Sequence, residues 1–97
     1  MSQSEHMADA SSPLAEQTER IEAIRKVVKQ LGKEATFSRF TQEEKTSLGD
    51  VVYTYKRSGI RTSENEVIRI AVNWLLADYH NDGQNSVLAR VLTGLHT

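Results

Sequence analysis

The segment from Val67 to Tyr79 limits the folds open to this chain more than any other feature. Its apolar side chains recur at helical spacing but lie on nearly every side of the helix they predict: Val67, Ile68, Ile70, Ala71, Val72, Trp74, Leu75, Leu76 and Tyr79. A helix that is apolar nearly all round has to be buried on more than one side. The chain has only 97 residues, which leaves little material to surround it. We therefore expect a second copy of the chain to cover part of this helix.

The small size of the chain and its lack of cysteine further limit the classes of protein to which it can belong. The length suits one small domain, and without cysteine neither a disulfide nor a cysteine-based zinc site can stabilise it. The three histidines have no metal-ligand spacing, so we expect no metal and no cofactor. No apolar run approaches the roughly 18 residues that span a bilayer, and the amino end lacks a signal-peptide layout. The expected location is the cytoplasm, with no membrane partner.

Two amphipathic segments flank a central unit over residues 33–80. Residues 1–13 are small and polar, which predicts a disordered leader. Residues 14–32 predict a helix with one apolar stripe, ended by Gly32. Residues 81–97 predict a loop and a short C-terminal helix. Each amphipathic helix needs a surface on which to dock.

The central unit reads as one strand followed by two helices. Residues 33–40 favour a short β-strand, and the chain offers no second strand to pair with it. Thr41 and Glu44 have the spacing of a capping box at the start of a helix that ends near Gly59. Ser63 and Glu66 have the same spacing before the second helix, which runs to about Tyr79. A lone strand needs a partner from another molecule, which again indicates a dimer.

Residues 35–79 resemble the ribbon–helix–helix DNA-binding family, which includes the Arc and methionine repressors. The matching residues are Arg39-Phe40-Thr41, the turn Gly59-Ile60, and the run from Thr62 to Arg69. The resemblance implies a mainly α-helical chain with one short β-strand. Two chains would pair their strands in an intermolecular two-stranded antiparallel ribbon and form an intertwined homodimer. The N-terminal and C-terminal helices would be additions to that domain.

The resemblance also implies which residues contact the bases of double-stranded DNA, since a β-ribbon fits the major groove. Arg39 is the expected main reader because arginine pairs bidentately with guanine. A register shift by one residue would bury Phe37 but also the charge of Arg39, at high cost. A local bulge would reconcile the two registers. The implied base contacts are Ala35, Phe37 and Arg39, with Thr36 and Ser38 as further candidates.

The amino end of the second helix is the implied phosphate anchor, through its free amides and its positive dipole end. The implied phosphate contacts are Arg61, Thr62, Ser63 and Glu64, with Lys56 and Arg57 nearby. Thr62 and Ser63 are also ordinary helix caps, and Lys56 and Arg57 also suit the last turn of the preceding helix. The expected dimer core is Phe40, Val67, Ala71, Trp74 and Leu75.

The charge distribution is compatible with a local nucleic-acid contact. The whole chain has a formal charge of −1, yet residues 33–63 hold an excess of basic side chains. No Gly-rich phosphate loop or convergent Ser, His and Asp set is present, so we expect no enzyme. We expect a sequence-specific DNA-binding homodimer that acts as a transcriptional repressor or regulator on a prokaryotic nucleoid. Such dimers could also assemble into higher-order complexes on DNA. The alternatives are a helical protein-interaction module, bound through the N-terminal helix, and an antitoxin or plasmid-maintenance factor.

Overall fold

The structure, a computed structural model, describes residues 13–97. The helices are α1 (Pro13–Lys29), α2 (Gln42–Arg57), α3 (Glu64–Asp82) and α4 (Val87–Leu95), and a short 3₁₀ turn, η2 (Gly83–Asn85), joins the last two. Apart from Pro13, which begins α1, the leader predicted over residues 1–13 lies outside the described residues. The helix predicted to reach Gly32 ends earlier, at Lys29, and Leu31 beyond it is exposed.

Local hydrogen bonds explain where α2 begins and ends. The capping box predicted for this helix is confirmed: the Glu44 amide donates to Thr41 Oγ1 at 3.0 Å, and the Thr41 amide donates to Glu44 Oε1 at 2.8 Å. At the other end Gly59 has a φ of 89°, a left-handed conformation that favours glycine. The Ile60 amide donates to the Tyr55 carbonyl at 2.9 Å. This turn leads the chain into α3.

The capping box predicted at the start of α3 is only half formed. The Glu66 amide donates to Ser63 Oγ at 3.0 Å, as expected of an N-cap. The Glu66 carboxylate, however, accepts from Thr62 Oγ1 at 2.6 Å. At its other end α3 runs to Asp82, past the predicted end near Tyr79, until Gly83 with a φ of 52° stops it.

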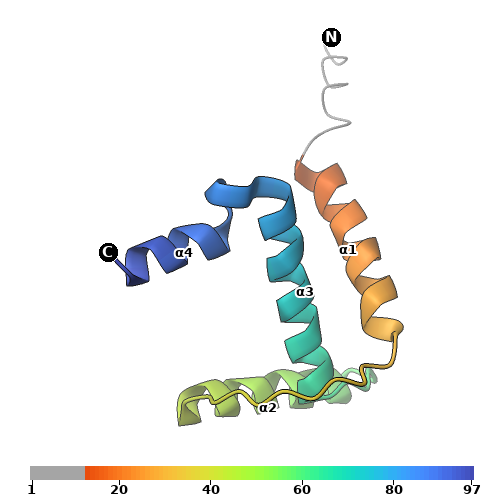
Figure 1. Cartoon of the computed structure of the whole chain (residues 1–97). Helices are drawn as coiled ribbons and strands as arrows, with labels where there is room; N and C mark the ends of the chain where they lie inside the picture. The colour runs from red at the N-terminus through yellow and green to blue at the C-terminus, as the bar shows by residue number, and fades with distance from the viewer. Residues whose placement is uncertain (1–12) are drawn as a thin grey trace.

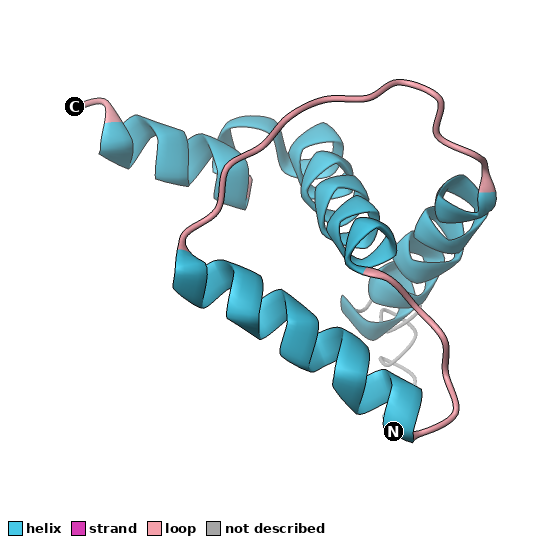
Figure 2. Ribbon diagram, turned by 90° about the horizontal axis from the view of Figure 1, so that it is seen from below, coloured by secondary structure: helices cyan, strands magenta, loops and turns pink. Residues whose placement is uncertain are grey.

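Helix α3 is the centre of the arrangement. Helix α1 packs along one side of α3, α2 crosses its amino end, and α4 projects from the opposite end on the side away from α1 (Figure 1). Seen from below, the segment between α1 and α2 passes around α3 from the end of α1 to the start of α2 (Figure 2). The central helix therefore has neighbours on several sides, but none covers it fully.

The predicted β-strand over residues 33–40 is wrong for the described chain, and so is the ribbon–helix–helix architecture with its intertwined, ribbon-paired dimer. Residues 13–97 contain helices and turns but no strand. The physical reason is the lack of a hydrogen-bonding neighbour: a strand needs another extended backbone about 4.8 Å away. The elements beside residues 33–40 are helices, whose backbone groups are already paired internally. The segment is therefore an extended connection.

The described chain has almost no hydrophobic core. Ile24, at 7% exposure, is its only buried hydrophobic residue, and α3 contains no buried residue at all. Large hydrophobic side chains of α3 are instead more than a third exposed, among them Ile70, Val72 and Trp74. The apolar positions of α3 thus form its surface in a single chain.

Candidate nucleic-acid interface

Residues 33–40, which carry every predicted base contact, form an exposed extended segment. Each of the eight residues is exposed, so the structure does not separate an inner face from an outer face. The Arg39 guanidinium carbon lies 5.7 Å from the centroid of the Phe37 ring, a cation–π geometry. Phe37 itself is 82% exposed. These two side chains are therefore neighbours at the surface, and neither is buried.

An open apolar hollow of about 790 Å³ lies where this segment meets α2 and α3. Its lining includes Phe40, together with Leu48 and Val51 from α2 and Val67 and Ala71 from α3. Three of the five expected dimer-core residues, Phe40, Val67 and Ala71, therefore share this hollow. The other two, Trp74 and Leu75, do not line it.

The predicted phosphate contacts cluster at the turn between α2 and α3. Lys56 and Arg57 lie in the last turn of α2, and Arg61 lies in the loop before α3. All three are exposed. The Arg57 guanidinium carbon lies 5.8 Å from the centroid of the Tyr53 ring. We call residues 56–63 the basic corner.

The polar groups at the start of α3 are partly occupied within the chain. The hydroxyls of Thr62 and Ser63 take part in capping, and Glu64 Oε1 accepts from Lys45 Nζ at 2.5 Å. The backbone amides of Glu64 and Asn65 donate to no acceptor among the described residues. A phosphate at this helix end would therefore be held by backbone amides, with the basic corner beside it, more than by the hydroxyls.

The basic side chains of the middle of the chain are largely free of carboxylates. Lys45 pairs with Glu64, but within residues 13–97 no carboxylate lies within ion-pair distance of Lys33, Arg39, Lys56, Arg57 or Arg61. By contrast, Arg20 lies 3.9 Å from Asp78, and Arg25 lies 2.8 Å from Glu22. Five unpaired positive charges therefore lie on the extended segment and the basic corner, although Lys26, Lys29 and Arg90 have no ion pair in the described chain either.

The structure does not bring these two groups of residues together within one chain. Arg39 precedes the N-cap of α2, whereas the basic corner follows its last turn. A helix of 16 residues spans roughly 24 Å at 1.5 Å per residue. One chain therefore offers two separate contact regions at opposite ends of α2.

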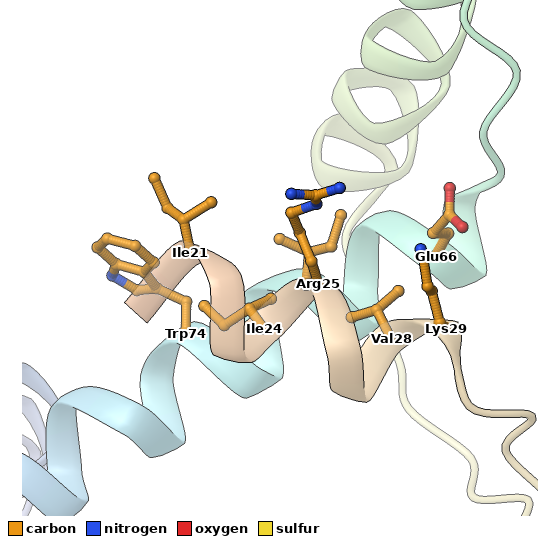
Figure 3. A pocket seen from close by; sticks show the side chains of 8 residues that line it. Ile21, Ile24, Arg25, Val28, Lys29, Glu66 and Trp74 are labelled. Carbon is orange, nitrogen blue, oxygen red and sulfur yellow. The ribbon is translucent and has the colours of Figure 1, made fainter. Parts of the chain in front are cut away.

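A second apolar groove, which the sequence patterns did not reveal, lies between α1 and α3. It has a volume of about 450 Å³, and Ile21, Ile24, Val28, Ile70 and Trp74 are among the residues that line it (Figure 3). The Arg20 guanidinium carbon lies 5.3 Å from the centroid of the Trp74 ring. Trp74 thus packs against α1 of its own chain. The apolar periodicity of both helices was visible in the sequence, but periodicity does not say which faces meet.

Other kinds of site are not found in the described part of the chain. Residues 13–97 contain no group of three or more His, Cys, Asp or Glu side chains that could hold a metal ion. None of the helices in that range is both long and apolar enough to cross a membrane. No family model matches the chain, and neither a curated protein nor a solved structure matches it.

Proposed function

We propose that this chain binds double-stranded DNA sequence-specifically as a homodimer and regulates transcription on a prokaryotic nucleoid. The extended segment over residues 33–40 would face the bases, with Arg39 as the main reader. The basic corner and the amides of Glu64 and Asn65 would hold phosphates. This role does not need a β-ribbon, since an extended exposed segment presents the same side chains.

The observation that carries the DNA proposal is the set of unpaired cations on the extended segment and the basic corner. A cation that is already paired with a carboxylate contributes little to phosphate binding, because it must first lose its partner. Lys33, Arg39 and the three cations of the basic corner have no such partner in the described chain. Along α2 the charges are also segregated, with Glu43 and Glu44 in the first turn and Lys56 and Arg57 in the last. Local charge therefore supports DNA contact despite a net charge of −1.

The exposed apolar surface supports the homodimer. Large hydrophobic side chains of the segment, α2 and α3 are more than a third exposed in one chain, among them Phe40, Val51 and Trp74, and a specific interface of standard size removes about 800 Å² from each partner. The hollow lined by Phe40, Val51 and Val67 combines residues of α2, α3 and the segment. A second copy that covers it would complete the missing core.

The experiment that tests the proposal is selection of bound sites from random duplex DNA by the full chain. We expect an enriched inverted repeat, because a two-fold symmetric dimer contacts two equivalent half-sites. Light scattering on the same sample should show a mass about twice the 10.9 kDa of one chain. No enriched sequence would refute DNA recognition, and a mass of one chain would refute the dimer.

Two substitutions separate base reading from phosphate binding. Arg39→Ala should weaken binding by about 1–3 kcal/mol for each half-site and relax the preference at one base pair in each half-site. Arg61→Gln should weaken binding to all sequences alike and, since a dimer loses two phosphate contacts, lower the slope of log K against log salt by about 1.8. Arg90→Gln is the matched control, because Arg90 is an exposed arginine of α4, the helix that projects from the end of α3 opposite to α2 (Figure 1). An Arg39→Ala variant that retains full sequence preference would show that another residue reads the bases.

A protein-interaction role is the second candidate, and the α1–α3 groove favours it. The groove is open, and its lining is mostly apolar, a chemistry that suits the apolar face of a partner helix. A chain that is dimeric but enriches no DNA sequence would favour this role. An antitoxin would combine the two, with DNA binding and a bound protein partner.

A further inference from the structure

Arg69 joins α3 to the end of α1 through a group of hydrogen bonds to backbone carbonyls. Its Nη1 donates to the Gln30 carbonyl at 2.7 Å and to the Val28 carbonyl at 3.2 Å. Its Nη2 donates to the Val27 carbonyl at 3.2 Å. These residues are 39 to 42 positions apart in the chain, and Arg69 is half-buried. No carboxylate in the described chain pairs with Arg69.

This geometry makes the guanidinium a cap for the carboxyl end of α1. The last carbonyls of a helix have no partner within the helix, and they form the negative end of its dipole. The planar fork of arginine can reach several such oxygens at once, whereas lysine presents a single point charge. Gly32 lies directly against the same group: a Cβ at this position would be 3.6 Å from the Arg69 guanidinium carbon. The chain therefore leaves α1 in contact with Arg69.

Arg69 is one of two fixed points of the extended segment. The segment is held at its start by the bonds from Arg69 to residues 27–30, and at its end by the Thr41 capping box. Between them, the backbone of residues 33–40 makes no hydrogen bond within the described chain. The course of the segment is therefore set mainly by these two ends.

We propose that Arg69 is a positioning residue that fixes the segment 33–40 relative to the amino end of α3, so that α1 becomes part of the DNA-binding unit. This inference rests on the proposed function. Arg69 is five residues after Glu64 on the same helix, about 8 Å along its axis. The side chain that holds the start of the base-reading segment is thus rigidly connected to the helix end proposed to hold a phosphate. Arg69 itself points at α1 and contacts no DNA.

The first test measures the motion of the segment without DNA. The chain has no cysteine, so Lys33→Cys accepts a single nitroxide label, and Thr93→Cys on α4 gives the matched control position. Arg69→Ala and Arg69→Lys should both increase the mobility of the label at position 33 and leave the label at position 93 unchanged. If Arg69→Ala loses helical circular dichroism, the label mobility in Arg69→Lys is the measurement to use. Lysine keeps the positive charge but lacks the planar guanidinium that reaches several carbonyls at once. An unchanged label at position 33 in Arg69→Lys overturns the proposal.

The second test measures DNA binding by the unlabelled variants. Arg69→Ala should reduce affinity for the selected site about tenfold or more, the loss expected when hydrogen bonds to a charged group are removed. Binding to unrelated duplex DNA and the salt slope should stay at their wild-type values, because no phosphate contact is lost. A salt slope lowered by about 1.8, two contacts per dimer, would mean that Arg69 contacts a phosphate directly, which overturns the positioning role. If the wild type binds no DNA, the proposed function fails, while the label mobility still decides whether Arg69 fixes the segment.

Discussion

Truncation of Ile24 is the most direct test of how α1 is held. Ile24 is 7% exposed and lines the groove between α1 and α3, whereas Ile21, one turn earlier on the same helix, is 45% exposed. Ile24→Ala removes the equivalent of three methylene groups, worth about 2.4 kcal/mol at about 0.8 kcal/mol each. The groove is already open to solvent, so the additional penalty for an empty cavity should be small. We therefore expect a loss of about 2.5 kcal/mol in the free energy of unfolding.

Ile21→Ala is the matched comparison for this prediction. About half of the Ile21 side chain is already in contact with solvent, so the same truncation should cost about 1.3 kcal/mol. Urea unfolding can be followed by the fluorescence of Trp74, the only tryptophan, which lines the same groove. All samples should have one protein concentration, because the stability of a dimer depends on it. Equal losses for the two variants, or a smaller loss for Ile24→Ala, would refute the packing of α1 on α3.

Three further predictions concern local structure away from the groove. Ser86→Ala should lower the free energy of unfolding by about 1–2 kcal/mol in urea melts. The Ser86 side chain is fully buried and caps α4 by accepting from the Ala89 amide at 3.1 Å. No loss of stability would mean that the bond from the Val87 amide to Asp78 suffices to start the helix. Gly59→Ala should lower the thermal midpoint, since a φ of 89° costs an L-residue about 1–2 kcal/mol. Gly94→Ala, at a helical position with open space around the new methyl group, should raise the midpoint by the equivalent of up to 1 kcal/mol or so. A Gly59→Ala variant as stable as the wild type would contradict the strained turn.

The positions of the helices could be predicted well because their signals are local. The cap of α2 joins Thr41 to Glu44, three residues away, and the glycine that ends it follows directly. The same holds for the Ser63 cap of α3. Where a nearby side chain competes, the prediction fails: Glu66 bonds to Thr62 instead of completing the second capping box. The sequence spacing does not predict whether the Glu66 carboxylate bonds to Thr62 or to Ser63, since the two are adjacent in the chain.

The prediction of a strand was wrong because, unlike a helix, a strand depends on a partner that is distant in the sequence. Residues 33–40 have the composition of a strand, but β-structure is decided by a neighbour that the segment itself does not contain. In this chain the neighbours are helices, so the backbone stays extended without a ladder. The roles assigned to Arg39 and to the basic corner are still predictions, since they depend on a DNA partner.

The sequence by itself determined which segments of this protein are helical and that Thr41 and Ser63 cap α2 and α3, because those interactions span only three or four residues. Only the tertiary structure decided that α1 docks on α3, that Trp74 packs against Arg20 of its own chain, and that Arg69 caps a helix about 40 positions away. The physical reason is that an apolar stripe or an arginine specifies the chemistry of its partner but not the identity of that partner. The identity is set by which faces meet when the chain folds.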